Sequence, residues 1–252
     1  MDRRQVTMQC LILAGGLGTR MRGYEPNVPK SMLLVAGEPF AGWQLRWLAS
    51  EGVVSVVFSI GHKGEVIEEF VGDGHRWGLD VTYVHERDVL LGTGGAVRFA
   101  AEREVLNEKF FLMYGDSYLQ VSMQEVDKAF SERGLPALMT VFENEGRWDS
   151  SNVVFDGERV VRYEKGLANP PPDMRYIDYG LLVLERSTVL DRISGKHPCD
   201  LSPFLGRLSE ESLLGGIEAF NRFYEIGSPE GIRELDLFLR SREGNVSPPE
   251  LH

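Results

Sequence analysis

A short apolar run near the amino terminus breaks directly into glycines, and this break constrains the fold more than any other feature of the chain. The apolar run covers Met8–Ala14, and glycines follow at Gly15, Gly16 and Gly18. An apolar run of this length predicts a buried strand, and glycines let the backbone turn and approach a ligand closely. The pattern therefore predicts the first strand of an open α/β sheet, with a ligand-binding turn at its carboxyl end.

Positive charge follows this turn at Arg20 and Lys30, where it could meet the oxygens of a polyphosphate. Two familiar phosphate-binding patterns do not fit. A P-loop requires a glycine directly before its lysine, but Pro29 stands there, and a dinucleotide-binding loop requires a third glycine where Met21 stands. The sequence favours a triphosphate cradle of another kind, and a purely structural turn remains the alternative.

Composition narrows the classes of function. The chain has 252 residues, a formal net charge of −11, 42% hydrophobic and 26% charged residues. This acidic balance argues against a nucleic-acid-binding protein, and no apolar run approaches the roughly 20 residues of a membrane span. Two cysteines, Cys10 and Cys199, make neither a disulfide framework nor a metal-binding spacing. With no apolar leader at the start, we expect a cytoplasmic protein that contacts neither membrane nor nucleic acid.

Strand-like and helix-like stretches alternate through the first half, which predicts parallel βαβ units. After the first strand, expected strands and helices there cover residues 41–52 (helix), 53–59 (strand), 63–71 (helix), 79–85 (strand), 94–104 (helix), 110–114 (strand), 123–133 (helix) and 136–143 (strand). Further on, we expect short strands at 152–155, 159–163, 176–184, 215–220 and 222–226, with helices at 187–194, 201–210 and 229–242. These predict one domain over residues 1–242 and a flexible tail at 243–252.

Two acidic residues follow strand-like stretches. Asp116 comes after the apolar strand 110–114, where a carboxylate would point into the ligand crevice and could bind Mg²⁺ together with substrate phosphates. A simple turn or a helix cap is the alternative. Glu225 ends a later strand, and the following Ser228 and Pro229 are explained by helix capping. Capping does not account for Glu225, which makes it the candidate second metal ligand.

Two further motifs are ambiguous when taken alone. Gly94 and Gly95 belong to a glycine-rich turn that could lie against a flat base, or could simply begin a helix. Glu164 and Lys165 could bind sugar hydroxyls and a phosphate, although such a pair is usually a solvated surface pair.

Taken in order, these pieces resemble the sugar-1-phosphate nucleotidyltransferases. The resemblance rests on Leu13-Ala-Gly-Gly-Leu-Gly-Thr-Arg-Met21, followed by Pro29-Lys30 and the later motifs, and it spans nearly the whole chain. It implies a Rossmann-like open, mixed and mainly parallel sheet flanked by helices, with a small β-rich sugar-side part. In that arrangement residues 8–135 would bind the nucleotide, and residues 136–242 would bind the sugar and close the site.

The resemblance also implies roles for individual residues. Arg20, Lys30 and Asp116 would be catalytic, and Asp116 and Glu225 would hold Mg²⁺. The implied nucleotide-binding residues are Leu13, Gly15, Gly16, Gly18, Thr19, Arg20, Gly94 and Gly95. The implied sugar-phosphate-binding residues are Asn152, Glu164, Lys165 and Gly180.

Two departures from the family pattern bear on the substrate. Glu225 stands where the late metal ligand is normally aspartate, and Tyr176-Ile-Asp-Tyr-Gly180 is unlike the usual Asn-x-Gly pattern. The expected partners are an NTP and a sugar 1-phosphate, and the protein is expected to be a monomer or a small homo-oligomer. The pattern is closest to heptose-1-phosphate guanylyltransferases. Uridylyl or thymidylyl transfer to N-acetylmuramate or a hexose 1-phosphate is the alternative, and a catalytically silent nucleotide-sensing subunit is an alternative of another class.

Overall fold

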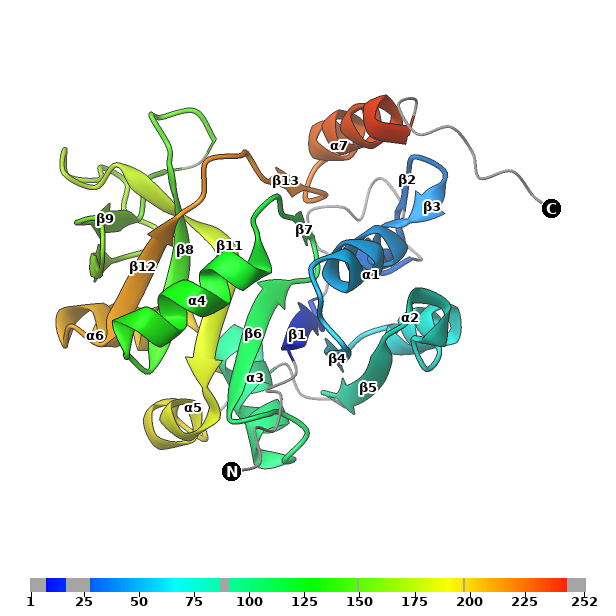
Figure 1. The fold of residues 1–252 in the computed structure, drawn as a ribbon, viewed down its shortest axis with the longest axis horizontal. Coiled ribbons are helices and arrows are strands. Elements are labelled where there is room, and N and C mark those ends of the chain that lie inside the picture. Colours follow the sequence, from blue (N-terminus) through cyan, green and yellow to red (C-terminus); the bar gives the residue numbers. More distant parts are fainter. Residues whose placement is uncertain (1–7, 17–27, 87–90, 149, 197, 244–252) are drawn as a thin grey trace.

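The computed structural model describes residues 8–16, 28–86, 91–148, 150–196 and 198–243, and it is built on a nine-stranded sheet. Its main path runs in the order β10-β9-β11-β6-β1-β4-β5, and β8 and β12 extend from β11. The strands of this sheet are β1 (Gln9–Ala14), β4 (Ser55–Ile60), β5 (Asp80–His85), β6 (Lys109–Tyr114), β8 (Ala137–Glu143), β9 (Val153–Phe155), β10 (Val160–Tyr163), β11 (Tyr176–Glu185) and β12 (Leu214–Glu218). Strands of the second half lie on one side of β6, and strands of the first half on the other (Figure 1).

Helices cover both faces of this sheet. They are α1 (Phe40–Ser50), α2 (Gly64–Val71), α3 (Gly92–Glu102), α4 (Met123–Arg133), α5 (Arg186–Arg192), α6 (Ser202–Glu210) and α7 (Pro229–Glu243). Two short 3₁₀ turns, η2 (Lys30–Met32) and η3 (His75–Trp77), and two small ribbons complete the described elements. One ribbon pairs β2 (Leu34–Val35) with β3 (Glu38–Pro39), and the other pairs β7 (Ser117–Tyr118) with β13 (Tyr224–Glu225).

Strand pairing confirms the expected parallel arrangement of the first half. β1 runs parallel to both β4 and β6, and β4 runs parallel to β5. In the second half β11 runs antiparallel to β6 and β8, while β12 returns parallel to β8. The later strands thus continue the first sheet, and the whole is a mixed sheet flanked by helices, as predicted.

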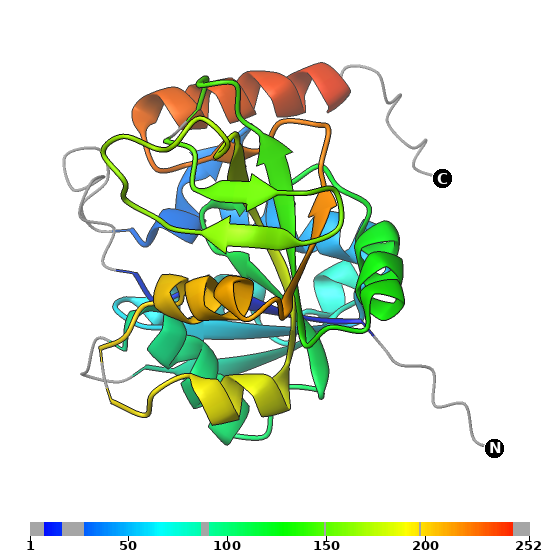
Figure 2. The same cartoon turned by 90° about the vertical axis from the view of Figure 1, so that its left-hand side faces the viewer.

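Alternation along β1 shows why both faces must be covered. Cys10 and Ile12 belong to one apolar core, and Leu11 between them belongs to the other, as expected of a strand with period two. Apolar residues of α1, α2, α4 and α7 fill the first core, and those of α3, α5 and α6 fill the second. In Figure 2, α4 (green) and α6 (orange) lie on opposite sides of the strands between them. The central strands β1, β4 and β6, covered on both faces, therefore carry apolar residues at successive positions.

Local sequence signals set several element ends. The α4 helix covers residues 123–133 as predicted, because the Ser122 hydroxyl accepts the Glu125 amide at 3.3 Å and Gly134 ends the helix at φ 60°. Residues 222–226, expected as one strand, contribute only Tyr224–Glu225 to β13. The two-residue strands β2, β3 and β7 were not predicted, because so short a strand carries no periodic pattern and forms only through its partner.

The register between β1 and β6 places the predicted motifs together. Leu13 lies opposite Tyr114, so the segments that follow both strands emerge side by side. No helix in the described part of the chain is long and apolar enough to cross a bilayer.

Candidate active site

A pocket of about 290 Å³ opens where β1 and β6 end. Five of the predicted site residues line it, namely Leu13, Gly15, Gly16, Lys30 and Asp116. Gly18, Thr19 and Arg20, the rest of the predicted cradle, lie outside the described residues. The pocket therefore joins the first strand turn to the Gly-Asp turn, as the order of strands requires.

Three glycines end three neighbouring parallel strands and allow their backbones to approach closely. A Cβ at Gly61, after β4, would lie 2.7 Å from the Gly15 carbonyl oxygen. A Cβ at Gly115, after β6, would lie 2.8 Å from the Leu13 carbonyl oxygen, and the Gly115 amide donates to that same oxygen at 2.9 Å. Any side chain at these positions would push the turns apart, so the floor of the pocket depends on them.

Two of the three residues expected to be catalytic, Lys30 and Asp116, form an ion pair in the structure. Lys30 Nζ lies 3.0 Å from Asp116 Oδ2, and both side chains are partly buried, 22% and 34% exposed. The neighbouring Ser31 is buried, and its hydroxyl donates to the Gly115 carbonyl oxygen at 3.1 Å. This contact anchors the η2 turn to the Gly-Asp turn, so Lys30 is held beside Asp116 by the backbone and not by charge alone.

Backbone pairing also brings Glu225 next to Asp116. In the β7–β13 ribbon Glu225 lies opposite Ser117, and the Ile226 amide donates to the Asp116 carbonyl oxygen at 3.0 Å. The backbones of the two residues are therefore adjacent, although Glu225 is not among the residues that line the pocket in the described part of the chain. A pair of carboxylates is a donor set that suits Mg²⁺, which takes one or two protein carboxylates and completes its shell with water and substrate phosphate. In the described part of the chain, no group of three or more His, Cys, Asp and Glu side chains could hold a metal by itself. Substrate oxygens would therefore have to complete the coordination.

A buried carboxylate that was not predicted, Glu86, forms another wall. Glu86 is 8% exposed, and its Oε1 accepts the Ser59 hydroxyl at 3.0 Å. A Cβ at Gly15 would lie only 2.1 Å from that oxygen, so the glycine leaves room for the carboxylate. Burial raises the pKa of Glu86, and the Ser59 hydrogen bond opposes this rise. The pocket thus contains an acceptor group at low exposure beside the glycine turn.

The α3 glycines differ in their position relative to the pocket. Among the described residues, Gly92, Thr93 and Ala96 line the pocket, whereas Gly94 and Gly95 do not. The Gly94 and Gly95 amides donate to the Cys199 carbonyl oxygen at 3.0 and 3.1 Å, and a Cβ at Gly94 would lie 2.8 Å from the Asp200 carbonyl oxygen. The two glycines therefore seat the segment before α6, and their place beside a base stays a prediction.

The predicted sugar-side residues lie beyond Tyr114 and outside the residues that line this pocket. Lys165 Nζ lies 5.7 Å from the centre of the Tyr114 ring, and a Cβ at Gly180 would lie 3.8 Å from the same ring. Asn152 is buried, and its side-chain oxygen accepts the Asp178 amide at 2.9 Å. Glu164 is exposed and pairs with Arg162 at 2.5 Å, so its contact with a sugar stays a prediction.

Comparison with known proteins assigns the family. The profile described as Nucleotidyl transferase matches residues 9–193, which is most of the chain. This chain belongs to the nucleotidyl transferase family. The matched region contains the pocket's glycine turn, Lys30, Asp116 and Lys165, and it ends before Asp200 and Glu225.

Among the relatives of known activity is the mannose-1-phosphate guanylyltransferase of Mycobacterium tuberculosis, 33% identical over 74% of this chain and 51% of that protein. The D-glycero-alpha-D-manno-heptose 1-phosphate guanylyltransferase of Campylobacter jejuni is 31% identical over 64% of this chain and 73% of that protein. The glucose-1-phosphate thymidylyltransferase of Streptomyces antibioticus is 30% identical over 68% and 48%. This chain spans about half the length of several of these relatives.

Solved structures share the fold. HddC from Yersinia pseudotuberculosis superposes with a TM-score of 0.75 at 22% identity, covering 92% of this chain and 100% of that chain. A putative glucose-1-phosphate thymidylyltransferase from Bacillus anthracis gives 0.81 at 16% identity, covering 97% and 98%. At sequence identities this low, the superpositions show only that this chain shares the fold of these two proteins.

Tyr114 and Asp200 are the other pocket residues that sequence reasoning did not single out. Burial raises the pKa of Tyr114 well above its ordinary value, and the carboxylates of Asp178, Asp116, Glu225 and Asp200 add to the effect. Tyr114 was visible as the last residue of a strand before Gly-Asp. Asp200 carried no such signal, because it reaches the pocket only through the contact of its segment with α3.

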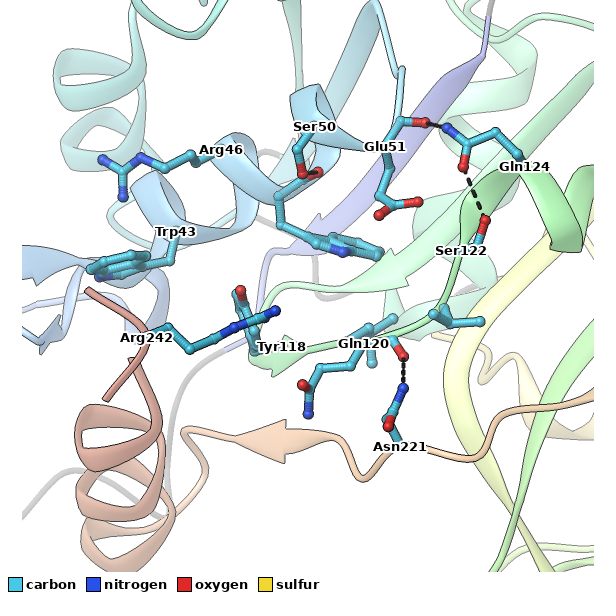
Figure 3. A pocket seen from close by; sticks show the side chains of 13 residues that line it. Trp43, Arg46, Ser50, Glu51, Tyr118, Gln120, Ser122, Gln124, Asn221 and Arg242 are labelled. Carbon is cyan, nitrogen blue, oxygen red and sulfur yellow. Dashed lines mark hydrogen bonds between the residues drawn. The ribbon is translucent and has the colours of Figure 1, made fainter. Parts of the chain in front are cut away.

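A larger hollow, about 600 Å³, lies elsewhere and contains none of the predicted site residues. Its walls come from α1, from residues 118–122 and from Arg242 in α7 (Figure 3). Its amides are used by the protein: Gln124 bonds the Glu51 carbonyl oxygen and Ser122, and Asn221 donates to the Gln120 carbonyl oxygen at 3.3 Å. The smaller pocket, with its paired charges and glycine floor, is the candidate active site of this family member.

Changing Gly92 to alanine is expected to destabilise the protein more than the same change at Gly134. Both glycines have positive φ, 72° and 60°. A Cβ at Gly92 would also lie 2.4 Å from the Cys199 carbonyl oxygen, whereas nothing lies within 4 Å at Gly134. We expect a loss of about 2–3 kcal/mol for Gly92→Ala and about 1 kcal/mol for Gly134→Ala, measured by urea unfolding. Equal losses would contradict the close packing of Cys199 on α3.

Proposed function

We propose that this chain transfers a nucleotidyl group from an NTP to a sugar 1-phosphate and releases pyrophosphate. The carrying observation is the Lys30–Asp116 pair, 3.0 Å apart, at a pocket floored by Gly15 and Gly16. Such a site combines close backbone approach with a positive charge and a carboxylate, which is what a triphosphate with Mg²⁺ needs.

In the proposed reaction an oxygen of the sugar phosphate attacks the α-phosphorus. A new P–O bond forms there, and the bond to the β-phosphate oxygen breaks, so that pyrophosphate leaves with both electrons of that bond. A phosphomonoester is largely ionised near neutral pH, since its second pKa is about 6. No general base is required, and no histidine lines the pocket in the described part of the chain. Catalysis then consists of alignment and charge neutralisation.

Individual side chains would divide this work. Lys30 would neutralise charge on the triphosphate, and Lys165, beyond Tyr114, would meet the sugar phosphate. Asp116 and Glu225 would hold Mg²⁺, which when bound neutralises phosphate oxygens. In this structure the Lys30 ammonium pairs with the Asp116 carboxylate. Lys30 would bind the triphosphate and Asp116 would bind the cation, so each group here neutralises the charge of the other.

For the base, we propose guanine. Guanine presents two adjacent donors, N1–H and N2–H, and a carboxylate can accept both. Glu86 supplies a carboxylate that is 8% exposed in this pocket. Three relatives that are 31–33% identical to this chain are guanylyltransferases, one of mannose 1-phosphate and two of D-glycero-alpha-D-manno-heptose 1-phosphate. We therefore propose D-glycero-D-manno-heptose 1-phosphate as the sugar substrate.

Two other functions are alternatives to this proposal. Uridylyl or thymidylyl transfer to N-acetylmuramate or hexose 1-phosphate is favoured by the thymidylyl- and uridylyltransferases among the relatives. A catalytically silent nucleotide-sensing subunit would need neither Lys30 nor Asp116, and both are present and paired. A pyrophosphate-release screen of five NTPs against a panel of sugar 1-phosphates separates them. Activity with another base or sugar names the alternative, and inactivity throughout with retained nucleotide binding indicates a sensor.

Changing Glu86 to glutamine is expected to weaken GTP use and, at the same time, to stabilise the protein. One guanine donor would lose its acceptor, so kcat/KM for GTP should fall about 10- to 100-fold. Because burial raises the pKa of Glu86, the folded state binds its proton more readily than the unfolded state, and this contribution to stability is lost as pH rises. The variant should melt above the wild type at pH 7, and the difference should shrink toward pH 4. An unchanged preference for GTP would exclude guanine recognition by Glu86.

A further inference from the structure

Asp178 is a partly buried carboxylate that the proposed reaction does not use. It lies in β11 just before a shift in register against β8. Its Oδ1 accepts the Gly180 amide at 3.0 Å, and its Oδ2 accepts the Tyr163 hydroxyl at 3.4 Å. Its own amide donates to the Asn152 side chain at 2.9 Å. The carboxylate is therefore held by an amide of its own strand and by Tyr163 of β10, while Asn152 holds the backbone of the same residue.

The positive charge that acts on the Asp178 carboxylate is that of Lys165. Burial raises the pKa of Asp178, and Lys165 opposes that rise more strongly than the hydrogen bonds from Gly180 and Tyr163. Lys165 Nζ also lies 5.7 Å from the centre of the Tyr114 ring. Tyr114 lines the pocket, and Gly180, two residues after Asp178, also lies beside its ring, so Asp178 and Lys165 are both placed close to Tyr114.

We propose that Asp178 is a positioning residue whose negative charge holds the Lys165 ammonium against Tyr114, ready to receive the phosphate of the sugar substrate. Lysine carries a point charge on a flexible four-carbon stem, so without a fixed partner it would have to be ordered when substrate binds. The proposal rests on the proposed function for the identity of the ligand only. The placement of Lys165 by Asp178 is a property of the protein alone.

Asp178 acts through Lys165 and not by touching substrate. It is not among the residues that line the pocket in the described part of the chain, and both of its oxygens have protein partners. Keeping a partly buried charge is costly unless it is paired. Asparagine would keep one oxygen to accept the Gly180 amide, and its NH2 group could donate to the Tyr163 oxygen in place of the hydrogen bond that the Tyr163 hydroxyl now donates. Asparagine, the usual residue at this position of the Asn-x-Gly pattern, would lack the negative charge.

The kinetic test uses Asp178→Asn, which retains an oxygen for the Gly180 amide. We expect KM for the sugar 1-phosphate to rise about tenfold while KM for the NTP changes less than twofold. Tyr163→Phe, which removes the other hydrogen bond and leaves the charge, should change neither value by more than about twofold. In a Lys165→Met background, Asp178→Asn should add nothing further. Additive effects would overturn the proposal, because they would show that Asp178 acts independently of Lys165.

A second measurement does not depend on activity. The chain contains six lysines, so the Cε–Hε signals of a lysine-labelled sample can be assigned with Lys165→Arg. The Tyr114 ring should displace the Lys165 signal from those of the other lysines, and Asp178→Asn should abolish the displacement, whereas Tyr163→Phe should keep it. An undisplaced signal in the wild type, or a displaced signal that survives Asp178→Asn, would overturn the proposal. If the screen finds no sugar 1-phosphate substrate, the proposed function fails, and the lysine signal still decides the placement.

Discussion

Lys30→Met is expected to lower kcat about 100- to 1,000-fold, the usual cost of removing one preorganised group that stabilises developing charge. The change removes the ammonium and keeps most of the apolar stem. Because Asp116 is 34% exposed, losing its ion pair should alter the free energy of unfolding by no more than about 1 kcal/mol. Steady-state assays of pyrophosphate release and a thermal melt measure the two quantities separately.

Lys109 offers a matched control. It pairs with Asp127 at 2.5 Å, with 22% and 30% of the two side chains exposed, which resembles the Lys30–Asp116 pair. Lys109 begins β6, at the end of the strand opposite to the pocket. Lys109→Met should therefore match Lys30→Met in stability and keep wild-type turnover. If Lys30→Met also kept normal turnover, the proposed role of Lys30 would be excluded.

Asp116→Asn is expected to lower kcat by a similar factor of about 100 to 1,000 and to raise the Mg²⁺ concentration needed for half-maximal activity. The amide keeps the size of the side chain and removes the charge that would bind both Mg²⁺ and Lys30. Turnover measured across a magnesium titration tests this. Asp127→Asn, which breaks the control pair, should leave the magnesium dependence unchanged.

The form of the magnesium titration decides how Asp116 acts. A lower plateau reached at higher Mg²⁺ indicates that the carboxylate binds the cation. A lower plateau with an unchanged midpoint would instead mean that Asp116 serves only to position Lys30, and would contradict its role as a metal ligand.

Local patterns in the sequence predicted most of the elements and the position of the chemistry along them. The turn after β1, Lys30, and Asp116 after β6 were identified because strand ends and glycines are local signals. Parallel strands then bring such ends together at one edge, as the register of Leu13 with Tyr114 shows. Glu225 was also identified as a carboxylate at a strand end, but it comes next to Asp116 through the antiparallel β7–β13 ribbon, and its pairing partner β7 was not foreseen.

Other features of the site depend on contacts between distant segments. Glu86 belongs to the pocket because a missing side chain at Gly15 leaves it room. Gly94 and Gly95 were placed beside a base because glycine-rich turns often bind ligands, yet here they accommodate Cys199 and Asp200. A glycine in a sequence shows that something approaches closely, and does not show whether that is a ligand or another part of the chain.

The sequence by itself determined the mixed α/β class, the strand that ends in the glycine turn, and the positions of Lys30 and Asp116 near strand ends, because these follow from periodicity and from residues adjacent in the chain. Only the tertiary structure decided that Glu86 and Asp200 enter the pocket, and that Asp178 lies close enough to Lys165 to interact electrostatically, with Lys165 beside the Tyr114 ring. The physical reason is that burial and charge pairing between distant segments depend on how strands and helices pack, which no local pattern encodes.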